Sequence, residues 1–131
     1  MADLIIVDTS VWIDYFRGDA SDSIVNSMRG LLDADSVAIT DVIRHELVVG
    51  AATSKDYQAL DEMLSALREY SLTTEKRAQF NYFAFQLKKQ GLLGKYTDAS
   101  IAFLAKAHHC PVFTLDRWFH KLADKKIIQV F

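Results

Sequence analysis

Short apolar runs that alternate with helical patterns constrain the fold of this chain more than any other feature. Residues 4–7 (LIIV) form a continuous run of mostly branched apolar side chains, which is typical of a strand buried on both faces of a parallel sheet. Further runs stand at 37–39 and 112–115, and weaker ones at 70–72 and 127–130. The pattern predicts an α/β fold with a mainly parallel sheet that helices cover on both faces.

Between the expected strands, apolar residues recur at helical spacing. Helices are expected directly after the first two strands, and then at residues 24–32, 55–69, 75–90, 97–109 and in a short stretch up to 123. Gly18, Gly91 and Gly94 are suited to end two of these helices. Because the chain has a single proline and no linker-like segment, its 131 residues predict one domain that spans 1–131.

Composition excludes several classes of protein. Half of the residues are hydrophobic and 24% are charged, so the chain can bury a core and is not a disordered tail. No apolar run approaches the roughly 18 residues of a membrane span, and the N-terminal run is too short for a secretory signal. The single cysteine, Cys110, has no partner for an internal disulfide, which is typical of a protein of the reducing cytoplasm.

The charges are distributed unevenly along the chain. The formal net charge is −2, but residues 1–66 hold 4 basic and 12 acidic residues, whereas residues 67–131 hold 11 basic and 5 acidic residues. Such an imbalance favours two surfaces with different roles. The alternative is that the fold mixes the two halves and cancels their fields.

Four acidic residues are notable for their place in this pattern. Asp8 and Asp116 follow expected strands, so both would project from one edge of a parallel sheet, although either could simply cap the next helix. Glu46 shares a helical face with apolar neighbours, and Asp98 opens a helix on its core-facing side. A carboxylate on an apolar face must be paired, protonated or bound to a cation. Arg44 is two residues from Glu46 and should point elsewhere.

A divalent cation would explain four acids at one place. Two such charges about 4 Å apart repel by roughly 4 kcal/mol near a protein surface, and the sequence offers no dedicated basic partner. Oxygen ligands suit Mg²⁺ or Mn²⁺. Water held by such an ion can attack a phosphodiester, so the acids favour metal-dependent hydrolysis.

Three segments that contain these acids resemble the motifs of a known family. They are IIVDTSVWIDYFRG (5–18), ITDVIRHELVVGA (39–51) and YTDASIAFLAKAHHCPVFTLD (96–116). In this order they resemble PIN-domain ribonucleases, in particular VapC-type toxins of bacterial toxin–antitoxin pairs. The resemblance covers essentially the whole chain. It implies a parallel sheet of about five strands and a Mg²⁺- or Mn²⁺-dependent endoribonuclease.

The resemblance also implies roles for individual residues. Four acids would hold the metal ion and its attacking water: Asp8, Glu46, Asp98 and Asp116. Small hydroxyl residues would support them: Thr9, Ser10 and Thr114. The implied substrate is RNA, cut to leave a 5′ phosphate and a 3′ hydroxyl. The implied partners are a second copy of the chain, in a homodimer, and a small cognate antitoxin.

Other residues are candidates for binding roles. Arg117 and Lys95 are the candidates for contact with RNA phosphates, and the alternative is an ordinary solvated surface. Aromatic residues cover several faces of the helix at 75–90, which favours a contact with a subunit or an antitoxin there. A zinc site at residues 108–110 is not favoured, because no second cluster completes four ligands.

Two other functions fit part of the pattern. A haloacid-dehalogenase-like phosphatase also has an aspartate after its first strand, but it needs a second aspartate where this chain has Ser10. A non-catalytic PIN-like binding module would bind partners without metal-dependent cleavage. Glycine-rich nucleotide-binding loops are absent from the sequence.

Overall fold

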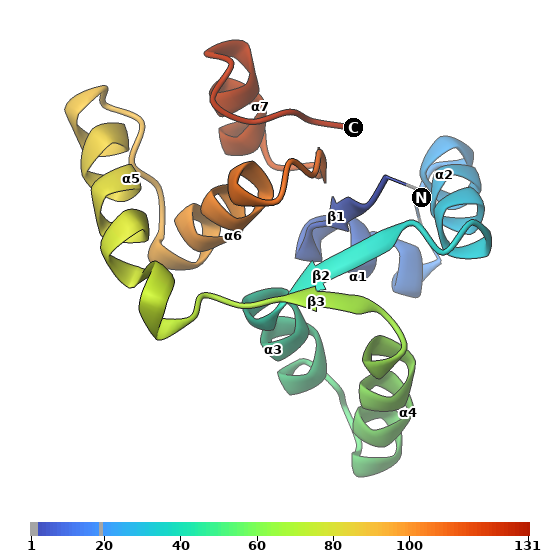
Figure 1. Cartoon of the computed structure of the whole chain (residues 1–131). Coiled ribbons are helices and arrows are strands. Elements are labelled where there is room, and N and C mark those ends of the chain that lie inside the picture. The colour runs from blue at the N-terminus through green and yellow to red at the C-terminus, as the bar shows by residue number, and fades with distance from the viewer. Residues whose placement is uncertain (1–2, 19) are drawn as a thin grey trace.

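A parallel sheet forms the centre of the molecule (Figure 1). The computed structural model describes residues 3–18 and 20–131, and within them the sheet has four strands in the order β3-β2-β1-β4. The strands are β1 (Ile5–Val7), β2 (Val37–Thr40), β3 (Arg68–Tyr70) and β4 (Val112–Phe113). The predicted α/β class and parallel pairing are therefore confirmed.

The sheet has one strand fewer than the expected five. At the C-terminus, Val130 makes only an isolated parallel bridge to Val112. The amide of Val112 donates to the carbonyl of Gln129, and the amide of Phe131 donates to the carbonyl of Val112, each at 2.9 Å. Because β4 is only two residues long, this pairing is too short to make a fifth strand.

Helices surround the sheet on both sides (Figure 1). The described part of the chain contains seven α-helices and one 3-10 turn: α1 (Thr9–Arg17), α2 (Asp22–Asp33), α3 (Asp41–Val49), α4 (Ser54–Ser65), η1 (Thr74–Lys76), α5 (Arg77–Lys89), α6 (Tyr96–Ala107) and α7 (Arg117–Asp124). Helix α4 ends four residues earlier than expected, because the chain after it turns to pair with β2 as β3. Among the described residues, no helix has the length and apolar character that a membrane span requires.

The core lies between the sheet and the helices. Every residue of β1 and β2 is buried, as the continuous apolar runs predict for strands with both faces covered. Trp12 of α1 is fully buried and donates its indole N–H to the carbonyl of Val7 at 3.1 Å. This contact joins the first helix to the end of the first strand and fixes the turn at residue 8.

All four strands run in the same direction, so their carboxyl ends lie along one edge of the sheet. Asp8 follows β1, Thr40 ends β2 and caps α3, and Asp116 comes three residues after β4. The acidic N-terminal half and the basic C-terminal half therefore meet at this edge, where parallel α/β folds place their sites.

Candidate active site

Asp8 lies at the centre of the candidate site. It directly follows β1, and only 5% of its surface is exposed. Asp8 occupies the N-cap position of α1, but its side chain makes no capping hydrogen bond. Instead, its Oδ2 accepts hydrogen bonds from Ser10 Oγ at 2.8 Å and from Thr114 Oγ1 at 2.9 Å. Helix capping therefore does not account for this carboxylate.

Ser10 and Thr114 also tie Asp8 to the turn after β4. Ser10 Oγ accepts the amide N–H of Leu115 at 3.1 Å, and Thr114 Oγ1 accepts the amide N–H of Asp116 at 3.0 Å. Each hydroxyl thus donates its one proton to Asp8 and accepts a backbone N–H on a lone pair. The two hydroxyls fix the Asp8 carboxylate relative to the backbone that presents Asp116.

Asp116, in contrast, does cap its helix. Its Oδ1 accepts the amide N–H of Trp118 at 2.9 Å, at the first turn of α7. The cap holds the side chain in one orientation and engages one of its two carboxylate oxygens. The capping interpretation is therefore correct for Asp116, and it is compatible with a ligand on Oδ2.

Glu46 lies on α3 and is exposed rather than buried. The expectation that its carboxylate is buried in an apolar face is wrong, because the buried residues of α3 are Ile43, Leu47 and Val48. Its Oε1 accepts a hydrogen bond from Thr9 Oγ1 at 2.9 Å. A residue next to Asp8 in sequence thus holds the carboxylate of Glu46.

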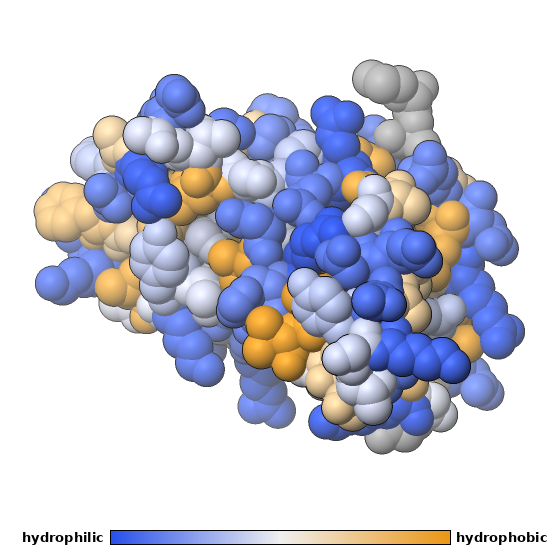
Figure 2. Space-filling model, turned by 90° about the horizontal axis from the view of Figure 1, so that it is seen from below, coloured by the Kyte–Doolittle hydropathy of each residue, from blue (hydrophilic) through white to orange (hydrophobic). Residues whose placement is uncertain are grey.

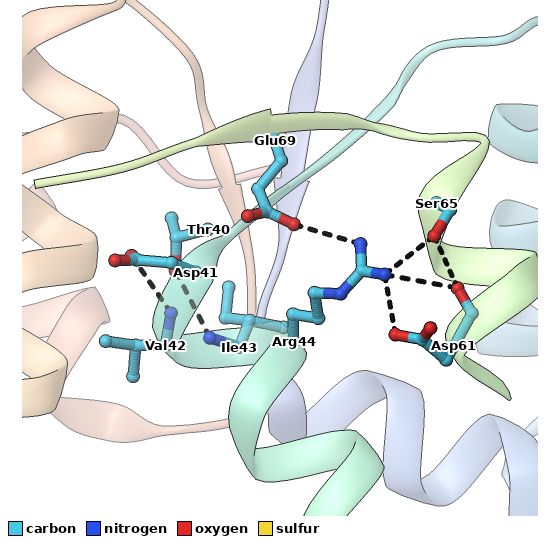
Figure 3. A network of polar contacts seen from close by, with 8 residues as sticks. All are labelled: Thr40, Asp41, Val42, Ile43, Arg44, Asp61, Ser65 and Glu69. Atoms are coloured by element: carbon cyan, nitrogen blue, oxygen red, sulfur yellow. Dashed lines mark hydrogen bonds and ion pairs between the residues drawn. The ribbon is translucent and has the colours of Figure 1, made fainter. Parts of the chain in front are cut away.

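Arg44 points away from Glu46, as its position on the helix predicts. Its Nη1 lies 3.2 Å from Glu69 Oε1, and its Nη2 lies 2.6 Å from Asp61 Oδ1 and 2.7 Å from Ser65 Oγ (Figure 3). Hydrogen bonding to Asp61 is the main cause that raises the pKa of Arg44 above its ordinary value. The network joins α3, α4 and β3. Because Arg44 is engaged there, it does not neutralise the charge of Glu46.

Asp98 shows that the acids act on one another. It lies half-buried in the first turn of α6. Burial raises the pKa of Asp98, and the negative charges of the other three acids raise it further, to about 6. The positive charge of Lys95 acts in the opposite direction. Asp98 therefore faces the combined field of Asp116, Asp8 and Glu46.

The carboxylate oxygens of the four acids suit a hard divalent cation, but they do not form a closed shell of protein ligands. Within residues 3–18 and 20–131, no three His, Cys, Asp or Glu side chains stand close enough together to hold a metal ion by themselves. Mg²⁺ usually binds through one or two carboxylates and keeps several waters. Mutually repelling carboxylate oxygens, with a raised pKa at Asp98, fit an ion that is bound partly through water.

The two basic candidates both lie next to an acid. Lys95 is exposed at the N-cap of α6 and is near enough to lower the pKa of Asp98. Arg117 is exposed and begins α7 directly after Asp116. Both could meet an anionic substrate that approaches these acids.

The sequence did not reveal a groove beside Glu46. This groove has a volume of about 750 Å³ and lies between α1, α3 and α4; residues that line it include Ile13, Phe16, Glu46, Leu47, Leu60 and Met63. Figure 2 views the molecule from the side of α3 and α4, where hydrophobic patches are separated by hydrophilic side chains. The available signal was the helical spacing of Ile13 and Phe16 on the exposed side of α1.

Comparisons with known proteins agree with this architecture. Residues 5–125 match the family model of the PIN domain. Ribonuclease VapC11 of Mycobacterium tuberculosis is 25% identical over 123 residues, which are 92% of this chain and 92% of the relative.

Solved structures with the same fold superpose on nearly the whole chain. The DNA-bound VapBC of Salmonella typhimurium superposes with a TM-score of 0.78 at 19% identity, covering 100% of this chain and 98% of that chain. VapBC-5 of Mycobacterium tuberculosis, a member of the VapBC family of toxin-antitoxin systems, has a TM-score of 0.65 at 23% identity, covering 98% and 97%. Because the family model spans nearly the full sequence, the chain belongs to the PIN domain family.

Proposed function

We propose that this protein is a divalent-metal-dependent endoribonuclease and the toxin of a type II toxin–antitoxin pair. The observation that carries the proposal is the hydrogen-bond network at the carboxyl edge of the sheet, in which Thr114 joins Asp8 to the turn of Asp116 and Thr9 binds Glu46. Together with burial, the charges of these three acids also raise the pKa of Asp98, which supports a fourth carboxylate at the same place. The similarity to a VapC ribonuclease over 92% of the chain supports the choice of RNA as substrate.

In this proposal, Asp8, Glu46, Asp98 and Asp116 hold Mg²⁺ or Mn²⁺. The bound ion would supply Lewis acidity and a water with a lowered pKa. The chain itself orients the donors: Ser10 and Thr114 fix Asp8, and Thr9 fixes Glu46. Lys95 and Arg117 are proposed to hold phosphates of the RNA at the exposed rim.

The partners are proposed on separate grounds. Similar solved structures include toxin–antitoxin assemblies, which supports a small antitoxin as the inhibitor of this chain. The mainly apolar groove beside Glu46 is the surface that we assign to an apolar segment of that antitoxin, because its occupant would lie against a proposed metal ligand. A homodimer and a cytoplasmic location complete the proposal.

Cleavage of a labelled RNA by the purified protein tests the function. We expect products with Mg²⁺ or Mn²⁺, no products with EDTA, and no products from Asp8→Asn. Asp33→Asn changes an exposed aspartate of α2 and is the matched control, expected to cleave like the wild type. Circular dichroism shows that each variant is folded. Equal cleavage by Asp8→Asn, or no cleavage by the folded wild type with either metal, would contradict the proposal.

A further inference from the structure

Two hollows meet on the surface at the C-terminal end of α6. One has a volume of about 430 Å³ and lies between α5 and α6, with Tyr82, Phe83 and Gln86 among its lining residues. The other has a volume of about 590 Å³ and lies between the ends of α6 and α7 and residues 127–130. Lys106 and His109 line both hollows. Lys106 and His109 are therefore a wall that the two hollows share.

The walls of these hollows carry positive charge. Lys106 and Lys126 are both exposed, and of the residues that the structure describes, no aspartate or glutamate lines either hollow. The acids of the C-terminal half are mostly placed elsewhere: Glu69 binds Arg44, and two others belong to the candidate active site. The surface thus has the charge that an anionic polymer requires.

Aromatic and amide groups stand beside these cations. Tyr82 is 62% exposed, so the face of its ring is accessible to a ligand. The Lys106 ammonium lies 5.8 Å from the ring centroid of Phe83, and Gln86 Nε2 donates a hydrogen bond to the Tyr82 hydroxyl. A basic groove interleaved with aromatic rings is typical of proteins that bind single-stranded nucleic acid, because bases stack on the rings and cations follow the phosphates.

The backbone is left-handed at two of the residues that line the hollows. His109 and Lys126 have φ angles of 56° and 60°, in the left-handed region just beyond the ends of α6 and α7. Glycine is the preferred residue at this position. A cation near a helix C-terminus does complement the helix dipole, so the experiment includes a cation at the same helix end that does not line the groove.

We infer that these hollows form one groove that holds single-stranded RNA away from the point of cleavage. The inference rests on the proposed ribonuclease function. Asp98 lies in the first turn of α6, and Lys106 lies eight positions later, which is about 12 Å along the helix. A strand that lies in the groove would therefore have to follow α6 for at least this distance to reach the acids.

Binding of a fluorescein-labelled, unstructured oligoribonucleotide in EDTA tests the groove without cleavage. The double variant Lys106→Gln, Lys126→Gln should bind more weakly and lower the slope of log K against log salt by about 1.4, because each lost phosphate contact on a single strand contributes about 0.7. Tyr82→Ala should weaken binding roughly tenfold, as expected for one lost stacked base.

Matched controls lie beside the altered residues. Lys125→Gln removes a charge from the same end of α7, and Phe85→Ala removes an exposed ring from α5; neither residue lines the groove. Both should bind RNA like the wild type. Unchanged affinity and salt slope in the groove variants, or no binding by the wild type, would overturn the inference. So would a dimer that dissociates in Tyr82→Ala with unchanged RNA affinity, because the face would then belong to a second copy.

Cleavage kinetics separate this inference from the proposed function. With Mg²⁺, the groove variants should raise KM for the long RNA and leave kcat unchanged, and they should cleave a dinucleotide like the wild type. A wild type that binds RNA but never cleaves it would contradict the proposed function, and the inference about the groove would still stand. If the wild type cleaves RNA and the groove variants have an unchanged KM, the inference about the groove is contradicted and the proposed function still stands.

Discussion

The hydroxyl of Thr114 donates a hydrogen bond of 2.9 Å to the carboxylate of Asp8, although the two residues are 106 positions apart in the chain. The bond joins the ends of β4 and β1, which are neighbours in the sheet. It also sets the place of the turn that carries Asp116, because the same hydroxyl accepts the amide of that residue. The candidate active site is thus assembled by strand pairing between the first and last parts of the fold.

Replacing Thr114 should damage both the fold and the site. Thr114→Val keeps the shape of the side chain but leaves the buried Asp8 carboxylate and the Asp116 amide without this partner. We expect a loss of about 1–3 kcal/mol in the free energy of unfolding, measured by urea denaturation. RNA cleavage should fall further than this loss of stability explains. Thr114→Ser keeps the hydroxyl and should retain both properties; if the valine variant matched the serine variant, the network would not position Asp8.

Asp98 predicts a pH dependence of stability. Its pKa is about 6 in the folded chain, above the ordinary value of 3.8. Between these two pH values the folded state holds a proton that the unfolded state has released, so the metal-free protein should lose stability as pH rises through this range. Asp98→Asn should remove this part of the pH dependence and raise the Tm at neutral pH in EDTA. The test is thermal unfolding across this range, with the exposed Asp124→Asn as control; a lower Tm for Asp98→Asn would contradict the assignment.

The same property predicts the effect of metal. Ionised Asp98 is repelled by Asp116, Asp8 and Glu46 at neutral pH, and a divalent ion that binds the folded state stabilises it by mass action. Mn²⁺ should therefore raise the Tm of the wild type and raise that of Asp98→Asn much less. An equal rise in both proteins would place the ion elsewhere on the chain.

His108 offers a test of a second polar cluster. Its ring stacks on Tyr70, with centroids 3.8 Å apart, and its Nε2 lies 3.1 Å from Lys76 Nζ. Burial, followed by the charge of Lys76, lowers the pKa of His108 below 6.5, so the stability from its neutral form is present above pH 6.5 and is lost as pH falls. Lys76→Met should raise the pKa of His108, measured by NMR titration of the ring protons. Lys88→Met on α5 is the control, and an unchanged pKa in Lys76→Met would contradict the contact.

Arg44 should matter for stability but not for cleavage. Its partners Asp61 and Glu69 are partly exposed, and exposed ion pairs are worth little each. Arg44→Lys cannot contact Asp61 and Glu69 at once, as the guanidinium does. We expect it to lower the free energy of unfolding, measured by urea denaturation, by about 1 kcal/mol. RNA cleavage should stay at the wild-type rate, because the guanidinium is bound by Asp61, Ser65 and Glu69, none of which belongs to the candidate active site (Figure 3). A large loss of kcat with normal stability would place Arg44 in the site.

The sequence predicted those parts of the fold in which buried apolar residues follow a regular pattern along the chain. The runs at 4–7 and 37–39 became β1 and β2, whose residues are all buried, and the PIN-domain resemblance is confirmed by the family match. The third strand lies two residues earlier than expected because it is an edge strand. Its Arg68 and Glu69 are exposed, so backbone pairing with β2 defines it rather than an apolar pattern.

The candidate site was predictable as a set of residues but not as a geometry. The sequence indicates Asp8 and Asp116 at strand ends and Asp98 at a helix start, and it indicates Glu46 from its apolar helical neighbours. All four lie in the family motifs, and their metal-binding role remains a prediction. The exposure of Glu46 could not be read from its apolar neighbours, because the direction of α3 depends on its packing against α4 and α1. The shared hydrogen bonds of Ser10 and Thr114 depend on strand order, which a single sequence does not fix.

Sequencing of RNA ends in cells tests the central claim most directly. The wild type and Asp98→Ala are each induced without an antitoxin, and newly formed 5′-phosphate ends are mapped across all cellular RNA. We predict discrete new ends at a small number of positions with the wild type and none with Asp98→Ala at equal protein level. The same ends in both strains, or no new ends with the folded wild type, would contradict the assignment of these four acids to RNA hydrolysis.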